Sequence, residues 1–314
     1  MAEFQLSPTD VLLRRELIAE GLTDRDICAQ VKAGALTKLR YGAYVPTQLL
    51  HEVDGVAMMR ARARAVLRTA HESAVLSHQN GLAEHGVPLW GVGLDETHLT
   101  RTDGRAGRRE AGVVHHRAAL DAPWWSVHHG VPVVHPARAA IEVATAHGAE
   151  AGLVAACGVL HRELATLAEL HDAAAAARHW PGSLGTRLVL ARADARLTNV
   201  AEARTWHLFF EQRIPRPEPQ VHVLDESGNL LGIVDFLWAG LGVFLEFDGR
   251  IKYEQHRRPG ESLADYLMRE KRREEQICVQ KGWICIRVTW ADLQRPTVLA
   301  RRIRQALDSR SSMR

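Results

Sequence analysis

The chain has 314 residues, 46% of them hydrophobic and 25% charged, so it is neither a disordered polymer nor a fibrous protein. This length fits two or three domains. The net charge is only +3, and the excess of basic residues lies in residues 202 to 314. This excess permits a basic surface patch that faces DNA phosphates in that region, provided that the acidic residues gather in a metal site.

No apolar run of the sequence is long enough to span a bilayer. The first ten residues also lack the basic stretch followed by an apolar one that a targeting segment needs. The four cysteines are scattered, without a Cys-x-x-Cys pair. We therefore expect a cytoplasmic protein with reduced thiols, no membrane association and no structural zinc site.

The first segment, residues 1 to 50, predicts three short helices followed by a strand. The helices are expected from Ser7 to Gly21, from Thr23 to Gly34, and from Leu36 to Arg40. Thr23 with Asp26 three residues later resembles a capping box. Tyr41 to Pro46 then alternates like a strand or wing.

Three runs of this segment carry a family resemblance: Gly21-Leu22-Thr23, Val31 to Leu36 and Leu39 to Val45. Through them the segment resembles the winged helix-turn-helix of AbiEi-type antitoxins. The resemblance implies that the segment binds DNA, with Lys38 and Arg40 on the phosphates, and that a toxin protein is a partner. The alternative is a small helical scaffold that contacts no DNA.

Residues 51 to 195 predict a mixed α/β domain. Helical patterns occupy residues 55 to 70, 136 to 148, 151 to 160 and 164 to 178, and the last three are rich in alanine. Strand-like pieces lie between them at Glu96 to Thr100 and Val113 to His116. The order of four short pieces resembles the middle portion of AbiEi-like proteins: Ser77 to Asn80, Gly86 to Pro88, His98 to Thr100 and Pro132 to Val134.

The chain holds 17 histidines, and two adjacent pairs, His115-His116 and His128-His129, fall in the middle segment. A metal-binding helix would place histidines on one face, as in His-x-x-x-His, with an acid nearby. That arrangement is missing from this segment. We therefore expect these histidines to be polar surface residues or buried residues with satisfied hydrogen bonds.

Residues 196 to 314 predict a helix, a three-stranded meander and two further helices around a strand. Asn199 caps a helix that carries Glu202. After Ile214 to Pro217 the pattern becomes strand-like. The expected strands are Gln220 to Leu224, Leu230 to Trp238 and Val243 to Asp248, and Ser262 to Lys281, Trp283 to Thr289 and Thr297 to Leu307 follow as helix, strand and helix.

Carboxylates concentrate on two neighbouring strands of this meander. Glu246 and Asp248 share one face because side chains alternate along a strand, and Asp235 meets that face if the register brings it opposite. Three carboxylates together are costly without a cation, and their oxygens suit Mg²⁺ or Mn²⁺. Lys252 is then expected to orient the attacking water or to neutralise the charge that develops on the phosphate, and Glu202 to complete the metal shell or to hold the attacking water. The alternative is a set of solvated hairpin acids.

The order of these elements resembles the PD-(D/E)XK nuclease core, and most of all very-short-patch-repair endonuclease domains. The matching positions are Gly232-x-x-Asp235-Phe236, Glu246-Phe247-Asp248-Gly249-x-x-Lys252-Tyr253, Glu270-x-x-Arg273, Gly282-Trp283 and Arg287. The resemblance implies that Asp235 and Glu246 bind the metal. Asp248 stands where the superfamily usually has lysine, so Lys252 supplies the missing cation or the site is altered.

The sequence thus predicts an α+β multidomain protein: a winged helix-turn-helix at 1–50, an AbiEi-like mixed α/β domain at 51–195, and an αβββαβα restriction-endonuclease-like core at 196–314. Arg273 and Arg287 are the expected DNA contacts of the last domain. The leading hypothesis is a metal-dependent endonuclease that hydrolyses DNA, in phage defence or a toxin–antitoxin system. The alternative is a non-catalytic DNA-binding repressor or antitoxin of the AbiEi type.

Overall fold

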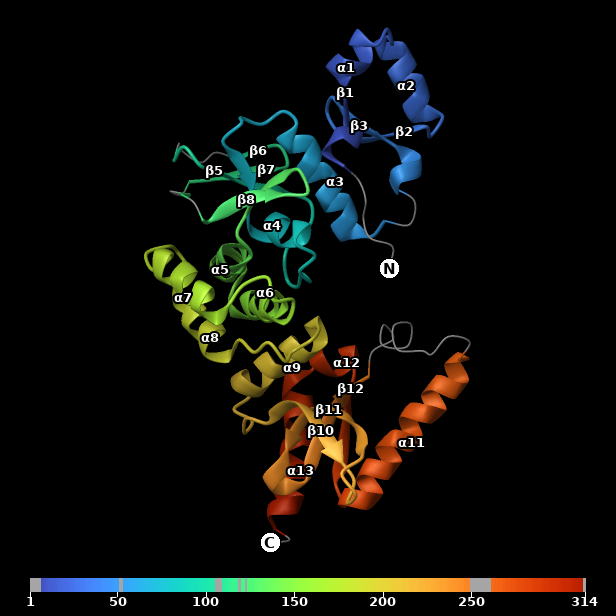
Figure 1. Ribbon diagram of the computed structural model, residues 1–314, viewed down its shortest axis with the longest axis vertical. Coiled ribbons are helices and arrows are strands. Elements are labelled where there is room, and N and C mark those ends of the chain that lie inside the picture. Colours follow the sequence, from blue (N-terminus) through green and yellow to red (C-terminus); the bar gives the residue numbers. More distant parts are fainter. Residues whose placement is uncertain are drawn as a thin grey trace. The chain divides into compact units, whose positions relative to one another are not determined.

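The chain forms a mixed α+β structure that divides into two compact units, Met1–Ala193 and Asp194–Arg314. The computed structural model contains twelve α-helices and three sheets among the residues that it describes (Figure 1). Those residues are 7–50, 53–104, 109–117, 120–121, 123–248 and 261–312. In these ranges, none of the helices has the length and apolar character that crossing a membrane requires.

The first unit begins with a three-stranded sheet in the order β1-β3-β2. Its strands are β1 (Leu12–Leu13), β2 (Leu36–Arg40) and β3 (Ala43–Pro46), and its helices are α1 (Arg14–Ala19) and α2 (Asp24–Lys32), with the short 3-10 turns η1 (Pro8–Asp10) and η2 (Thr47–Leu50) at either side. The predicted capping box of α2 is confirmed. The Thr23 hydroxyl accepts from the Asp26 N–H, and the Asp26 carboxylate accepts from the Thr23 N–H.

Two predictions for this segment are wrong. Leu36–Arg40 is a strand, not a helix, and the first helix starts only at Arg14 because Leu12 and Leu13 pair with β3 instead. Leu36 and Leu39 are three residues apart, as on a helix face, and both are buried. A register shift between Lys38 and Arg40 lets both point inward from a strand. Pairing with β3 therefore overrides the helical spacing.

A six-stranded mixed sheet in the order β6-β7-β5-β4-β9-β8 follows in the first unit. Strand β4 pairs antiparallel with β5 and parallel with β9, and β5 pairs parallel with β7. The strands are β4 (Ala74–Leu76), β5 (Thr97–Arg101), β6 (Arg109–Glu110), β7 (Val113–His116), β8 (Trp125–His128) and β9 (Val131–Val134). The predicted strands near 96–100 and 113–116 are confirmed.

Six helices accompany this sheet: α3 (Gly55–Leu67), α4 (His78–Glu84), α5 (Pro136–His147), α6 (Ala149–His161), α7 (Leu167–Ala176) and α8 (Leu184–Arg192). The alanine-rich helices are confirmed as close-packing elements. A Cβ built on Gly152 of α6 would lie 2.3 Å from the Cβ of Ala144 in α5, so only glycine allows this approach of the two backbones.

The second unit contains a four-stranded sheet in the order β10-β11-β12-β13. The strands are β10 (Glu218–Leu224), β11 (Leu230–Trp238), β12 (Val243–Phe247) and β13 (Ile284–Val288), and the 3-10 turn η3 (Ala239–Leu241) joins β11 to β12. The first three strands are antiparallel, which confirms the meander, and β12 pairs parallel with β13. A parallel partner needs a long crossover connection.

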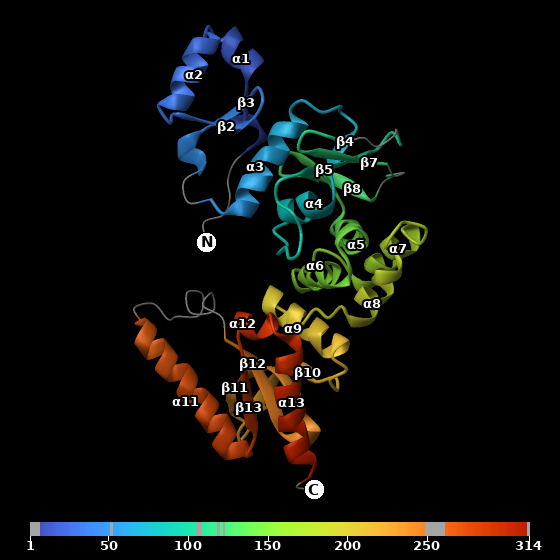
Figure 2. The same ribbon diagram turned by 180° about the vertical axis from the view of Figure 1, so that it is seen from behind.

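Helices cover both faces of this sheet. They are α9 (Val200–Glu211), α11 (Leu263–Lys281), α12 (Trp290–Leu293) and α13 (Pro296–Ser311). Helix α11 lies on one face, whereas α9 and α13 lie on the other (Figures 1 and 2). Trp206 and Phe209 of α9 pack on Phe236 of β11. Ile277 of α11 packs with Leu237 and Phe244 on the opposite face. The sheet is therefore buried on both sides, as its apolar strands predict.

Candidate metal and nucleic-acid site

Asp235 and Glu246 occupy neighbouring positions on the two central strands of the second unit. Phe236 of β11 pairs with Leu245 of β12, so one step further along the antiparallel pair come Asp235 and Glu246. The Asp235 carboxylate is 7% exposed, and its Oδ2 accepts a hydrogen bond from the Phe247 N–H, 2.7 Å away. Its Oδ1 lies 3.4 Å from the Gln220 side-chain amide. Backbone and side chain thus fix this carboxylate between β10 and β12.

The Glu246 carboxylate points to the α11 face and binds Arg273. Their closest atoms, Oε1 and Nη2, are 2.8 Å apart, and the same guanidinium lies 3.1 Å from Glu270. Arg273 also donates to the Ile233 carbonyl over 3.0 Å. Burial lowers the pKa of Arg273, but the charges of Glu246 and Glu270 outweigh burial and raise its pKa overall.

Asp248, which follows β12, pairs with Arg287 of β13. Asp248 Oδ2 and Arg287 Nη1 are 3.3 Å apart, and Arg287 also binds Glu274 of α11. Burial lowers the pKa of Arg287, and the bond to Glu274 together with the charges of Glu274 and Asp248 raises it overall. Both arginines expected on DNA therefore lie beside predicted metal ligands, and DNA contact through them stays a prediction.

Glu202 lies in the first turn of α9 and is 1% exposed. Its carboxylate accepts a hydrogen bond from the Thr198 N–H over 2.8 Å, and its own N–H donates to Asn199 Oδ1, so the predicted Asn199 cap is confirmed. These bonds give Glu202 a role at the start of the helix. Its predicted contact with a metal stays a prediction, and Lys252 lies outside the described residues.

A second group of ligand atoms adjoins the first. Oxygen and sulfur atoms of Glu246, Glu274 and Cys285 lie within 4.8 Å of one another, whereas within the described residues Asp235, Glu246 and Asp248 do not bring three ligand oxygens that close. Burial strongly raises the pKa of the Cys285 thiol, so its sulfur is protonated at neutral pH.

Sequence reasoning missed Glu274 and Cys285, although each had a local signal. Glu274 immediately follows Arg273, an expected DNA contact, on the helix predicted from Ser262 to Lys281. Cys285 lies two residues before Arg287 on the same strand, and side chains two apart share a face. Their approach to Glu246 depends on α11 packing over the sheet, which the sequence does not display.

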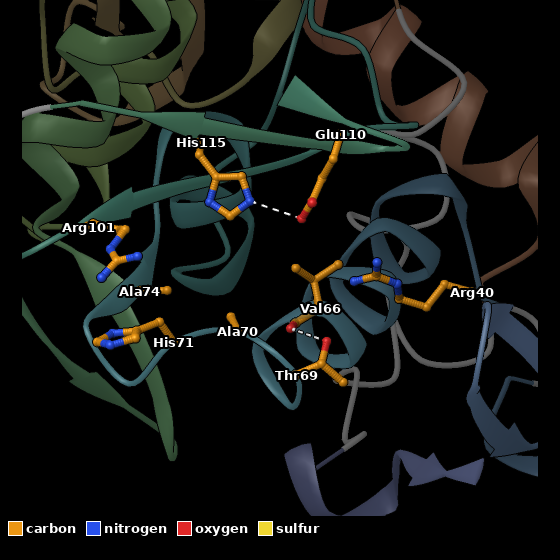
Figure 3. Close-up of a pocket in the computed structure, with 9 residues that line it drawn as sticks. All are labelled: Arg40, Val66, Thr69, Ala70, His71, Ala74, Arg101, Glu110 and His115. Atoms are coloured by element: carbon orange, nitrogen blue, oxygen red, sulfur yellow. Dashed lines mark hydrogen bonds and ion pairs between the residues drawn. The ribbon is translucent and has the colours of Figure 1, made fainter. Parts of the chain in front are cut away.

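The basic residues predicted to contact DNA in the first unit lie on β2. Lys38 is exposed, and its ammonium group lies 5.8 Å from the ring centre of Tyr41, a side chain that is 87% exposed. Arg40 lines a pocket of about 150 Å³, which Arg101, Glu110 and His115 also line (Figure 3). His115 and Glu110 pair across it over 3.2 Å. The β2–β3 hairpin thus presents positive charge at its turn.

No known family model matches the chain, and no curated protein matches it either. Its function is therefore inferred from the geometry of these residues.

Proposed function

We propose that residues 196–314 form a divalent-metal-dependent nuclease domain that hydrolyses DNA phosphodiesters. The observation that carries this proposal is the adjacency of Asp235 and Glu246 on two central strands of a sheet buried on both faces. The strand order, with helices on both sides and a parallel fourth strand, is consistent with an αβββαβα restriction-endonuclease-like core. Buried acids of this kind need a cation or a positive side chain beside them.

The charge around these acids leaves room for one divalent ion. Five carboxylates meet two guanidinium groups at this site, namely Asp235, Glu246, Asp248, Glu270 and Glu274 with Arg273 and Arg287. The difference is three negative charges, of which one divalent ion would neutralise two. Asp235 and Glu246 would hold Mg²⁺ or Mn²⁺, which prefer oxygen ligands. When bound, such an ion polarises a phosphoryl oxygen and lowers the pKa of its water.

Arg273 and Arg287 supply the fixed positive charge that a phosphodiester substrate needs. Each guanidinium is held by a carboxylate, so it is oriented before any ligand arrives. Planar guanidinium groups match phosphate oxygens in a two-point arrangement. In this proposal each arginine bridges two carboxylates and neutralises charge on the phosphate.

The first unit supports a DNA substrate. Its opening sheet and helices, with the exposed Lys38 and Tyr41 on one hairpin, are consistent with a winged helix-turn-helix over residues 1–50. A phosphate contact by Lys38 or Arg40 would hold the chain on DNA. The proposal includes a toxin protein as a partner, and only the resemblance to AbiEi-type antitoxins supports that partner.

One observation favours a second function, that of a non-catalytic DNA-binding repressor or antitoxin. Arg273 binds Glu246 and Arg287 binds Asp248, so arginine already neutralises two of the three predicted metal ligands. A nuclease fold with such pairs can persist as a binding module. The ion pairs then contribute to structure in place of a metal.

Supercoiled plasmid separates the two functions. The purified full chain is incubated with plasmid and Mg²⁺ or Mn²⁺, beside Asp235→Ala and Glu246→Ala. The nuclease proposal predicts metal-dependent nicking or cutting that each variant reduces by at least about 100-fold. Asp225→Asn is the matched control, because Asp225 is an acid of the exposed β10–β11 turn. Plasmid binding without metal and without cleavage would favour the repressor.

A further inference from the structure

Three histidines from separate elements meet in the first unit. They are His78 at the start of α4, His98 in β5 and His116 at the end of β7, and one nitrogen of each ring lies within 4.8 Å of the others. His98 Nδ1 and His116 Nε2 are 2.9 Å apart. The His78 and His116 rings stack with centroids 3.8 Å apart. Such a cluster of imidazoles needs a proton, a water or a metal ion between its nitrogens.

The sheet itself brings these rings together. Thr100 of β5 pairs with His116 and His98 pairs with Val114, so His98 and His116 project from the same face of neighbouring strands. Strand β4 lies on the other side of β5, and the chain leaves it directly into α4. The Ser77 N–H donates to the His98 carbonyl over 3.0 Å, which holds the start of α4 against β5. The cluster is therefore a consequence of tertiary pairing.

A buried carboxylate orients one of the rings. Glu142 of α5 is 1% exposed, and its Oε2 accepts a hydrogen bond from the His78 N–H over 2.9 Å and lies 3.5 Å from His78 Nδ1. Arg138 holds the other oxygen of the same carboxylate at 2.9 Å. A carboxylate behind the non-ligating nitrogen is the usual support of a metal-binding histidine. Ser77 Oγ also lies 3.1 Å from His78 Nδ1, so these two partners leave Nε2 as the nitrogen available to a metal.

The backbone at one of these histidines is strained. His78 has a φ of 54°, a left-handed conformation that is unfavourable for a residue with a side chain. Backbone strain of this kind is concentrated at sites that bind ligands.

Polar atoms without partners surround the cluster. Within the described residues, Asn80 Nδ2, Thr100 Oγ1 and His147 Nε2 are buried atoms that lack a hydrogen bond. Asn80 and Thr100 are fully buried, and Thr100 shares the face of His98 and His116. The His147 ring lies 6.4 Å from that of His98. Buried polar atoms are seldom left unsatisfied, so this group indicates a missing ligand or bound water.

We propose that His78, His98 and His116 bind a divalent transition-metal ion, Zn²⁺, with a fourth position open to water or His147. Imidazole nitrogens are typical zinc ligands, and three of them with an open position form a familiar zinc set. Zn–N distances of about 2.0–2.1 Å separate tetrahedral nitrogens by roughly 3.3 Å. The stacked rings therefore turn apart slightly when the ion enters. Whichever of His98 and His116 carries the proton between them then moves it to its other ring nitrogen and offers the freed lone pair to the ion.

This site differs in chemistry from the carboxylates of the second unit. Those acids offer hard oxygens to Mg²⁺ or Mn²⁺, whereas the histidines offer only nitrogen. The histidine site thus neither depends on the proposed nuclease function nor fails with it. Sequence spacing did not reveal it, because the three residues lie on three elements rather than on one helix.

Zinc titration of the full chain tests this proposal. The protein is stripped with a chelator and titrated calorimetrically with Zn²⁺ in excess Mg²⁺, so that the oxygen-rich acids are already occupied. We expect one equivalent to bind at the histidine site, and the double variant His98→Gln/His116→Gln to weaken that binding by at least about 100-fold. The matched control is His128→Gln/His129→Gln, a second pair of adjoining rings, which keeps wild-type affinity.

Two further measurements identify which residues bind the zinc ion. Cys285→Ser removes the competing Glu246, Glu274 and Cys285 group, and we expect it to leave the zinc titration unchanged. Zinc X-ray absorption of the wild type needs no variant of the cluster and should show imidazole ligands. Unchanged affinity in the double histidine variant, absorption dominated by oxygen or sulfur ligands, or no binding by the wild type would each overturn the proposal.

Discussion

The Asp235 carboxylate accepts a hydrogen bond from the Phe247 N–H across a distance of 2.7 Å, and so ties the middle of β11 to the end of β12. Both residues are at least nine-tenths buried. Asp235 therefore has two separate roles in this proposal. Its oxygen accepts the hydrogen bond that holds β12 in place, and its negative charge is available to a cation. Substitutions that remove one property and keep the other can tell them apart.

Asp235→Asn and Asp235→Ala should both lose plasmid cleavage but should differ in stability. Asparagine retains an oxygen that can accept from the Phe247 N–H, whereas alanine leaves this buried donor without a partner. We expect Asp235→Ala to lower the free energy of unfolding by about 1–3 kcal/mol more than Asp235→Asn does. Urea unfolding followed by tryptophan fluorescence measures the difference. Equal stability of the two variants would show that the bond is unimportant.

Gly232 controls the position of Arg273. A Cβ at residue 232 would lie 2.8 Å from Arg273 Nη1 and 2.9 Å from its Cδ, so Gly232→Ala pushes the guanidinium away from Glu246. Because the atoms displaced belong to the far end of a flexible side chain, we expect a loss of only about 1 kcal/mol in the free energy of unfolding. In Gly240→Ala the new Cβ meets nothing within 4 Å, and the change should stay within about 0.5 kcal/mol. Similar thermal denaturation of both variants would contradict this explanation.

The stability of the first unit should fall with acid through His85. Burial lowers the pKa of His85 to about 4 despite its hydrogen bond to the Val134 carbonyl, with His128, His135 and Glu84 as its charged or titratable neighbours. An unfolded histidine titrates near 6.5. The unfolded chain thus binds the proton first, so stability is full above pH 6.5 and is lost as the pH falls towards 4.

The His85→Gln variant isolates this effect, since glutamine can still donate to the Val134 carbonyl. Between pH 6.5 and 4 its free energy of unfolding should fall less steeply than that of the wild type, by up to about 1.4 kcal/mol per pH unit. His179→Gln, at an exposed position of the same unit, is the control and should follow the wild-type slope. Parallel pH profiles for wild type and His85→Gln would exclude His85 as the cause.

DNA binding by the first unit should depend on Lys38 and Arg40. Removing a basic side chain that binds a phosphate weakens binding to every sequence and reduces the salt slope of log K by about one per phosphate. We expect both effects in Lys38→Ala and Arg40→Ala, measured by fluorescence anisotropy of a labelled duplex over a range of salt concentrations. Lys32→Ala changes an exposed lysine at the end of α2 and should bind as the wild type does. An unaltered slope in all three would place the DNA-binding surface elsewhere.

The sequence predicted those parts of the fold that depend on neighbours in the chain. The caps at Thr23 and Asn199 are confirmed because a side-chain oxygen reaches an N–H only three residues away. The meander of β10, β11 and β12 is confirmed because short turns join strands with clear alternation. The adjacency of Asp235 and Glu246 follows from the same local connections.

Tertiary structure alone decided the rest. Leu36–Arg40 has a helical spacing of leucines, yet pairing with β3 makes it a strand. The packing of helix α11 on the sheet brings Arg273 into contact with Glu246. In the first unit, the six-stranded sheet and α4 bring three histidines from distant parts of the chain together. Periodicity records only which residues of one element face the same way, whereas pairing between strands and packing between layers choose which of those faces meet.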